Sequence, residues 1–504
     1  MRLKTSYVAL FVVVFFTLMG ISCTKIKVQT VGGILKFSVD TLKFDTVFTA
    51  EGSFTTGLVI YNPQNEEVLI SSVKLSEGAN SFFHLNVDGF VGNNISNQPN
   101  LKIAAHDSMY VFATVNINPN NTTNPFLITD SLIVTMNGQN FYVPFSAYGQ
   151  NAYYIVDSIL AGTNITWGTK LPYVIINSAE VNTGSTLTIL PGAHIYMHQN
   201  SALVVNGKLI TQGTVQDSVL FQSDRPDPAY WNWVYYPGAW GGIYFGSYSN
   251  GSNLSYTRIE SGGNGVLSSI PAEIIIFPDS FNMYTTGDMS STTGTFLSSG
   301  TPQLSLNHCF VENSYGYGIY NLQGSLVASN TNFNTTGQQA LAIIQGGYDS
   351  ITNCTFANYG NTATGLAHTG YGTVAILDYY SDGVDQPTYG GLKAVMRNCI
   401  VYGSLDSEII CDATGTTSGI TANLLFDHCL LKFGTDTESF VKFNACIFNQ
   451  DPMFKSTASG DFHLTVGSPA IGAGDSIYTT VPGNVDLDGN SWNGGDIGCY
   501  KFTQ

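Results

Sequence analysis

The chain has 504 residues, of which 43% are hydrophobic and only 11% are charged. At roughly 150 residues per domain this length predicts two to four domains, and the low charge with 53 glycines excludes a coiled coil and a charge-rich disordered chain. The 18 Lys and Arg face 35 Asp and Glu, for a net charge of −17. Because nucleic-acid phosphates require clustered cations, no nucleic-acid partner is expected.

The N-terminal residues predict an export signal. Arg2 and Lys4 form a basic head, residues 7–19 are almost uninterrupted apolar residues, and small residues precede Cys23. The run Gly20-Ile21-Ser22-Cys23 resembles the lipobox of bacterial lipoproteins, in which the chain is cut before a cysteine that then carries lipid. This resemblance implies a signal peptide over residues 1–22, lipidation of Cys23 and a tether over residues 23–28. An ordinary secretory signal cut nearby is the alternative.

The same resemblance implies a location and a first partner. We expect an exported protein that is lipid-anchored to the outer membrane, with the lipid membrane as its partner. The resemblance to Bacteroidota-type lipoproteins also implies that display on the cell surface would be signalled by acidic residues directly after the lipidated cysteine. Here residues 24–27 are Thr, Lys, Ile and Lys. The periplasmic face and the cell surface therefore both stay open.

Residues 29–150 predict an antiparallel β-sandwich. Short runs of apolar and polar residues, such as residues 57–61, 110–115 and 131–135, are separated by turn formers. About seven short strands at that spacing are typical of a sandwich. The stretch from Thr56 to Ile70 resembles the immunoglobulin-like modules of the Hydin/ASPM type. This resemblance implies that the sandwich acts as a spacer or presents another domain.

Residues 151–450 predict a right-handed parallel β-helix. Short apolar strands punctuated by Gly, Asn and Asp, without helical periodicity, are typical of a β-solenoid. The succession of residues 184–193, 202–209 and 240–245 resembles the first coils of the pectate-lyase-like superfamily. The predicted fold class is therefore all-β: an Ig-like β-sandwich followed by a right-handed parallel β-helix with a C-terminal cap.

The coils have a countable period. Four-residue motifs begin at Asn307, Asn330, Asn353 and Asn398, and a related motif begins at Asp427. Steps of 23 residues predict one coil each, and the 45-residue step between the third and fourth motifs predicts nearly two coils. We interpret the Asn residues and the adjacent cysteines as structural ladders. Two coils would separate Cys309 from Cys354 by about 10 Å, too far for a disulfide, so buried free thiols are expected.

Residues 451–504 predict a closing segment. Motifs such as residues 451–454 and 468–474 resemble the choice-of-anchor-like C-terminal segments of exported β-helix proteins, which implies a cap on the solenoid. Within it, Asp486, Asp488 and Asn490 alternate around Gly489 as in a Ca²⁺ loop, although the later Glu of an EF-hand is absent. A tight turn is the favoured interpretation, so no cofactor is expected and Ca²⁺ is the alternative.

A cluster of aromatic residues interrupts the predicted solenoid and is flanked by prolines. Exposed aromatic rings beside amides suit stacking on sugar rings. The alternative is a loop that folds back onto the solenoid or the sandwich. The candidate ligand contacts are Tyr230, Trp231, Trp233, Tyr235 and Tyr236.

Two groups of residues are candidates for catalysis. A lyase acting on polyuronates needs a basic group and a positive charge against the substrate carboxylate, and Arg258 and Arg397 fall within the predicted coils. A glycoside hydrolase needs paired carboxylates, and Asp378, Asp382 and Asp385 form the densest acidic group. These acids are equally typical of turns in a polar insertion, and the paired-Asp and Gly-His-Gly motifs of β-helix hydrolases are missing.

The sequence therefore favours a lipid-anchored cell-envelope β-helix protein without catalytic activity. Such a protein would bind a glycan or an envelope protein, or present its β-helix to one of these partners. A polysaccharide lyase or glycoside hydrolase is the first alternative. A structural adhesin or scaffold is the second.

Overall fold

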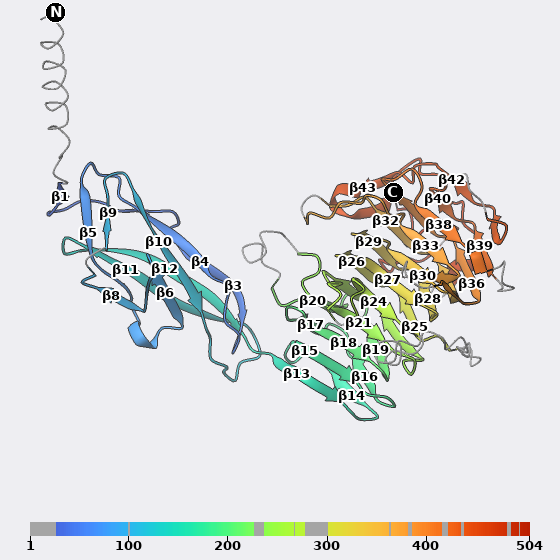
Figure 1. The fold of residues 1–504 in the computed structure, drawn as a ribbon, viewed down its shortest axis with the longest axis horizontal. Coiled ribbons are helices and arrows are strands. Elements are labelled where there is room, and N and C mark those ends of the chain that lie inside the picture. Colours follow the sequence, from blue (N-terminus) through green and yellow to red (C-terminus); the bar gives the residue numbers. More distant parts are fainter. Residues whose placement is uncertain are drawn as a thin grey trace, which may run out of the picture. The chain divides into compact units, whose positions relative to one another are not determined.

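A computed structural model describes residues 27–98, 101–225, 236–266, 268–277, 301–361, 364–381, 386–415, 422–434, 438–480, 485–492 and 494–503. The chain divides into two compact units, Met1–Asn151 and Ala152–Gln504. Strands dominate both units (Figure 1), and the helical segments are short 3₁₀ turns, among them η1 (Gly78–Asn80), η3 (Thr457–Ser459) and η4 (Ser476–Thr480). Within the described ranges, no helix is long and apolar enough to cross a membrane.

The first unit is a β-sandwich. Its strands alternate buried and exposed residues, as in β10 (Ser108–Val115), because side chains of a strand point to opposite faces in turn. Leu58, Phe83 and Phe145 are among the fully buried side chains between the sheets. One sheet contains β1 (Val28–Gln29), β5 (Glu67–Leu75), β11 (Phe126–Met136), β12 (Gln139–Gln150) and β3 (Leu42–Phe48), with β8 (Asn94–Ser96) and β9 (Lys102–Ile103) paired to β5; the other contains β2 (Lys36–Phe37), β4 (Thr56–Tyr61), β10 (Ser108–Val115), β6 (Phe83–Val87) and β7 (Phe90–Val91).

The second unit is a parallel β-helix, and the predicted all-β fold class is confirmed. One wall is a ten-stranded parallel sheet whose strands pair in register, as Leu326 does with Asp349. Inward-facing Ile, Val, Leu and Phe side chains fill the interior, where the stacked rings of Phe333 and Phe356 lie 4.6 Å apart. The strands of this wall are β14 (Ile165–Trp167), β16 (Thr186–Ile189), β19 (Lys208–Gln212), β22 (Ser252–Ser255), β25 (Leu304–Asn307), β28 (Ser325–Ser329), β31 (Gly347–Thr352), β36 (Leu392–Arg397), β39 (Ala422–Asp427) and β41 (Val441–Asn444).

An 18-stranded sheet forms the rest of the solenoid. Strands of successive coils pair along it, as β26 pairs with β29 and β29 with β32. Its strands are β13 (Tyr153–Leu160), β15 (Tyr173–Val181), β17 (His194–Met197), β18 (Ala202–Val205), β20 (Val219–Ser223), β21 (Gly242–Phe245), β23 (Thr257–Glu260), β24 (Ala272–Ile276), β26 (Phe310–Ser314), β27 (Tyr317–Leu322), β29 (Asn332–Thr336), β30 (Leu341–Ile344), β32 (Thr355–Asn358), β33 (Val374–Leu377), β37 (Ile400–Gly403), β38 (Ile409–Asp412), β40 (Leu430–Leu431) and β42 (Ile447–Phe448).

The coil count differs from the prediction in one place. Thr355 pairs directly with Ile400, so the 45-residue step from Asn353 to Asn398 is one coil and not nearly two. The additional residues form connections between the strands of that coil, including the antiparallel pair β34 (Tyr379–Tyr380) and β35 (Thr388–Tyr389). A connection of this kind lengthens the period without adding a strand to the stack.

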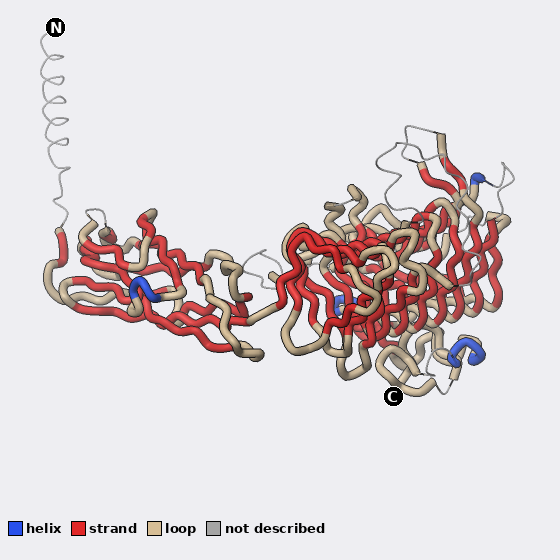
Figure 2. Tube along the Cα trace, turned by 90° about the horizontal axis from the view of Figure 1, so that it is seen from below, coloured by secondary structure: helices blue, strands red, loops and turns tan. Residues whose placement is uncertain are grey.

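The C-terminal segment packs along the outside of the solenoid. It begins with the antiparallel pair β43 (Phe454–Ser456) and β44 (Asp461–Leu464). Leu464 and Ile497 pack on Ile400 and Leu430, which belong to late coils. Tyr500 reaches the earlier coil of Asn332, whose amide nitrogen donates to the phenol oxygen at 3.2 Å. The C-terminus accordingly lies beside the stacked strands (Figure 2), and the segment covers the flank of several coils.

Candidate functional site

Each of five coils turns out of the ten-stranded wall through a single left-handed residue. Residues with short polar side chains, and to a lesser degree His, tolerate positive φ because those side chains can hydrogen-bond locally. Repetition of this turn keeps the strands in register. The five residues are His308, Asn330, Asn353, Asn398 and His428, with φ between 47° and 55°; Tyr256 and Ala445 hold the same position in two further coils, with φ of 44° and 50°.

We call these left-handed residues the turn ladder. Their positions differ from the predicted alignment of the motifs by one residue at two of the coils. Asn307 and Asp427 start the sequence motifs, yet they lie on the strands, and His308 and His428 occupy the turns. The residue before each turn instead belongs to an outward-facing row across the sheet. Register pairs Asn307, Ser329, Thr352, Arg397 and Asp427 in that order.

A second row runs parallel to the first, two positions earlier on each strand. It contains Asn253, Ser305, Val327 and Ser350, again paired in register. Adjacent strands of a sheet lie about 4.8 Å apart, so each row offers one side chain per coil at that interval. The outer face of the wall therefore carries hydroxyl and amide groups at a regular spacing.

A groove of about 620 Å³ lies over these rows. It crosses the strands β22, β25, β28 and β31 and reaches Arg397 of β36, and Ile477 and Tyr478 of η4 contribute to its wall. Both polar groups and apolar surface line it. The lining residues are Gly251, Ser252, Asn253, Thr301, Pro302, Ser305, Leu306, Asn307, Val327, Ala328, Ser329, Ser350, Thr352, Arg397, Ile477 and Tyr478.

Arg397 and Tyr478 form the charged part of the groove. The guanidinium carbon of Arg397 lies 5.2 Å from the centre of the Tyr478 ring, a distance suited to a cation–π contact. The Tyr478 hydroxyl donates to Oδ2 of Asp427 at 2.8 Å, and this hydrogen bond raises the phenol pKa. Burial would raise the pKa of Asp427, but hydrogen bonds from Tyr478, His428 and Asn444 outweigh it and hold that pKa below its usual value. Asp427 is therefore ionised at neutral pH.

The closing segment is held in place by the turn ladder. The side-chain amide of Asn353 donates to the carbonyl oxygen of Tyr478 at 2.9 Å. Asn398 exchanges two hydrogen bonds of 2.9 Å with the backbone of Asp475. The ladder asparagines thus position η4 against the groove, in addition to forming the turns. Tyr478 was not among the predicted site residues, since no local sequence pattern links it to Arg397.

Arg258 and Arg397, both predicted as catalytic candidates, lie on different walls. Arg258 belongs to β23 in the 18-stranded sheet, forms an ion pair with Glu312 and lies 4.1 Å from the centre of the Phe310 ring. Glu260 is the in-register neighbour of Glu312. Burial raises the pKa of Glu260, opposed in part by the charge of Arg258.

Asp378 lies outside the groove. Its side chain is buried and accepts a hydrogen bond from the backbone N–H of Gly415 at 3.2 Å. Burial and the nearby Asp412 raise its pKa. The other two members of the predicted acidic group, Asp382 and Asp385, lie outside the described residues.

Residues 486–490 form a hydrogen-bonded turn. The buried carboxylate of Asp486 accepts backbone N–H groups of Asp488, Asn490 and Lys501 and the side-chain amide of Asn490. Asp488 instead contacts Nε2 of His463 at 2.7 Å. These contacts fit a turn rather than a Ca²⁺ loop. Across the described part of the chain, no three His, Cys, Asp or Glu side chains are arranged to hold a metal ion.

Most of the predicted aromatic cluster lies outside the described residues, namely Tyr230, Trp231, Trp233 and Tyr235, as does the predicted lipidation site Cys23. Tyr236 is described and packs against the solenoid core.

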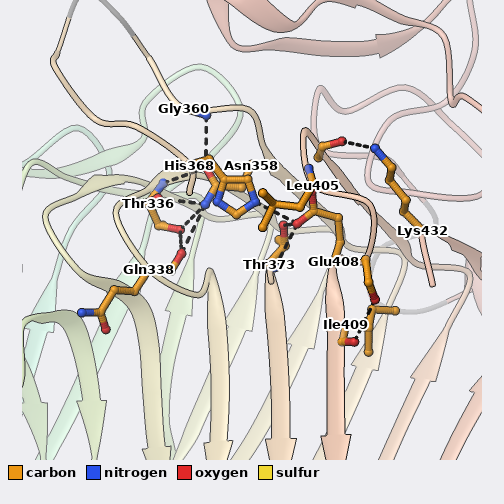
Figure 3. Close-up of polar contacts among 12 residues, drawn as sticks. Thr336, Gln338, Asn358, Gly360, His368, Thr373, Leu405, Glu408, Ile409 and Lys432 are labelled. Atoms are coloured by element: carbon orange, nitrogen blue, oxygen red, sulfur yellow. Dashed lines mark hydrogen bonds and ion pairs between the residues drawn. The ribbon is translucent and has the colours of Figure 1, made fainter. Parts of the chain in front are cut away.

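A buried contact between a carboxylate and an imidazole lies away from the groove. Glu408 accepts Nε2 of His368 at 2.8 Å, the hydroxyl of Thr373 at 2.6 Å and the backbone N–H groups of Thr373 and Leu405 (Figure 3). His368 and Thr373 belong to the connection between β32 and β33, and Glu408 precedes β38. This cluster ties a long connection to the next coil.

No protein-family model matches the chain, and no curated protein sequence matches it. Among solved structures, a family 123 glycoside hydrolase from Clostridium perfringens is similar at 11% identity over 24% of this chain and 26% of that chain, with a TM-score of 0.18. The Salmonella enterica SafA pilin in complex with the SafB chaperone is similar at 13% identity over 24% of this chain and 57% of that chain, with a TM-score of 0.16. Similarities this low carry no argument about the site.

Proposed function

We propose that this chain is a lipid-anchored cell-envelope protein whose β-helix binds a glycan in the groove without cleaving it. The observation that carries the proposal is the groove itself, which extends over five neighbouring strands and repeats hydroxyl and amide groups along its floor. Five strands at about 4.8 Å span roughly 19 Å between the first and the last. An extended polymer with a regular repeat fits such a site.

A glycan suits this lining better than a protein partner does. Sugar rings combine hydroxyl groups with small apolar faces, and the groove combines Ser, Thr and Asn side chains with the apolar surfaces of Pro302, Val327 and Ile477. The centres of protein–protein interfaces are instead enriched in large aromatic anchors that fill pockets. Among the described residues of the lining, Tyr478 is the single aromatic one.

The membrane anchor rests on the N-terminal sequence alone. If Cys23 carries lipid, the wild-type protein should incorporate radiolabelled palmitate in a bacterial host and partition into detergent. C23A should do neither. Labelling of C23A to the wild-type level would contradict the anchor.

The binding proposal is tested by filling the groove. Ser350 lies on its floor, so S350W should remove retention of the protein in gels that contain the bound polysaccharide, while the melting temperature stays near the wild-type value. S218W places the same side chain at an exposed position outside the groove and is the matched control. Absence of retention on every polysaccharide tested would contradict glycan binding, and release of reducing or unsaturated ends would contradict a non-catalytic role.

A glycoside hydrolase is the second candidate, and the pair Glu260 and Glu312 favours it. The two acids are in-register neighbours on adjacent strands, which lie about 4.8 Å apart, near the roughly 5–5.5 Å between the carboxyl groups of retaining hydrolases. Burial raises the pKa of Glu260, whereas Arg258 pairs with Glu312, so the two environments differ as an acid and a nucleophile require. Hydrolysis lost in both E260Q and E312Q but kept in S350W would establish this function.

A further inference from the structure

We infer that the groove selects a glycan with an anionic substituent, a carboxylate or a sulfate ester, which pairs with Arg397. The inference rests on the proposed function and names the ligand class for that site. Both substituents present two or more oxygens to a planar guanidinium, so one recognition chemistry serves both.

The first argument is that Arg397 is an unneutralised cation in a strongly acidic chain. Only four of the 504 residues are Arg, and the net charge is −17. Arg258 shows the usual arrangement, with Glu312 as its partner. Within the described ranges, no carboxylate lies within ion-pair distance of Arg397, and its buried Nε has no hydrogen-bond acceptor. Arg397 lines the groove, and a cation without a carboxylate partner favours an anionic ligand there.

The second argument is that the nearest acid is already occupied. Asp427 is the in-register neighbour of Arg397 on β39. Its Oδ1 accepts Asn444 Nδ2 at 2.8 Å and lies 2.8 Å from His428 Nδ1, and its Oδ2 accepts the Tyr478 hydroxyl. The carboxylate is therefore satisfied from the side of the closing segment and the next coil, and the Arg397 guanidinium, which also interacts with the Tyr478 hydroxyl, has no carboxylate partner among the described residues.

The third argument is orientation. The Tyr478 ring lies beside the guanidinium at 5.2 Å, and the backbone of Tyr478 is fixed by Asn353. An arginine restrained in this way loses little side-chain entropy when it binds, because its planar donors are already placed. Thr352 and Ser329 continue the same row away from Arg397 at one residue per coil. The anionic group should therefore sit at the Arg397 end, with neutral sugar hydroxyls along the rest.

The test compares three oligosaccharides of equal length in calorimetric titrations with the full-length protein in detergent: a neutral galactan, an oligogalacturonate and a sulfated galactan. At least one anionic probe should bind about 10- to 100-fold more tightly than the neutral one, the range expected for hydrogen bonds to a charged group. R397Q should remove this preference, and R397K, which keeps the charge without the planar fork, should retain part of it. K393Q removes the same charge from the same strand outside the groove and should bind like the wild type.

The outcomes separate the inference from the proposed function. If the neutral probe binds as tightly as both anionic probes and S350W abolishes that binding, the anion inference fails while the groove stands. Equal losses in R397Q and K393Q would show a general charge effect and also overturn the inference. Binding of none of the three probes would overturn both proposals. Preference for one anionic probe over the other would support the inference and identify the substituent as carboxylate or sulfate.

Discussion

Glu408 is a buried carboxylate that accepts four hydrogen bonds, three from His368 and Thr373 in the connection of the preceding coil and one from Leu405 in its own connection. Both Glu408 and His368 are almost fully shielded from solvent, with side-chain exposures of 0% and 1%. Removal of one partner from a buried pair leaves the other without compensation, which typically costs about 3–5 kcal/mol. The residue is therefore a stabilising link, far from the groove.

We expect E408A to lower the urea midpoint of the β-helix markedly, because the donors of Thr373, Leu405 and His368 lose their shared acceptor. E438A changes an exposed acid in the same region and should leave the midpoint within error. Urea unfolding followed by circular dichroism makes the comparison. Equal midpoints for the two variants would contradict the assigned role of Glu408.

His463 gives the closing segment a dependence on pH. The hydrogen bond to Asp488 is the main cause of its raised pKa, with Asp461 adding to it and burial opposing it. A raised folded-state pKa means that the contribution to stability is full below the unfolded pKa of about 6.5 and is lost as pH rises through the folded value. Because the ring is about one-third exposed, the effect should be below about 1 kcal/mol.

The stability difference between the wild type and H463Q should therefore be largest near pH 5.5 and should shrink toward pH 9. Hydrogen exchange of residues 461–464 at both values measures it locally. H84Q, an exposed histidine of the sandwich, is the control. A difference that grows with pH would contradict the assignment.

At the level of elements, the turn ladder performs two tasks that mutations can separate. Asn398 has φ of 49° and also holds Asp475 with both atoms of its amide. N398G keeps the backbone relaxed but loses the side-chain contacts, whereas N398A loses the contacts and strains the turn. We expect N398A to be less stable than N398G by about 1 kcal/mol, with both below the wild type in thermal melts. Equal stability of the two variants would show that the left-handed turn contributes nothing.

The cysteines form a second ladder inside the coils. Residues Cys309, Cys354, Cys399 and Cys429 are buried free thiols, as predicted. The backbone nitrogen of Cys399 lies 3.5 Å from Sγ of Cys429 on the next coil, and burial raises the pKa of Cys309 to about 12. A thiol with that pKa is almost entirely protonated at pH 8, and the thiolate is the reactive form.

We therefore expect N-ethylmaleimide at pH 8 to leave these four positions unmodified in the native protein and to label them all in urea. Peptide mapping by mass spectrometry assigns the sites. Cys411 serves as the internal comparison: burial raises its pKa to about 12 as well, but its side chain is only partly buried, so it should react sooner through its greater access alone. Rapid native labelling of Cys399 would contradict its placement in the core.

At the level of the whole molecule, the closing segment covers apolar surface and also completes the groove. Ile400 and Leu430 lie beneath Leu464 and Ile497, and Tyr478 of the same segment lines the groove. Truncation after residue 450 should therefore expose an apolar flank, increase binding of a hydrophobic dye and abolish glycan retention. In the full-length chain, I497D should loosen the same flank. A soluble truncated chain that retains glycan normally would contradict this dual role.

Much of the fold was predictable because it follows from patterns among residues that are close together in the sequence. Alternation in runs such as residues 110–115 depends on the two-residue period of a strand, and the Asn-rich motifs mark the turns. The coil count and the alignment of the motifs were predicted wrongly because both were based only on the number of residues between motifs. The period from Asn353 to Asn398 includes connections whose length does not count coils, and the shift of Asn307 by one position could be detected only from the strand register.

The sequence by itself determined an all-β chain with a sandwich followed by a solenoid, since strand periodicity and turn residues act over a few neighbours. Tertiary structure alone decided the groove. Arg397 and Tyr478 are far apart in the sequence, and they meet because the closing segment folds back over the coils. It likewise decided that Arg258 and Arg397 lie on different walls, because the wall that a residue occupies depends on where every preceding coil turns.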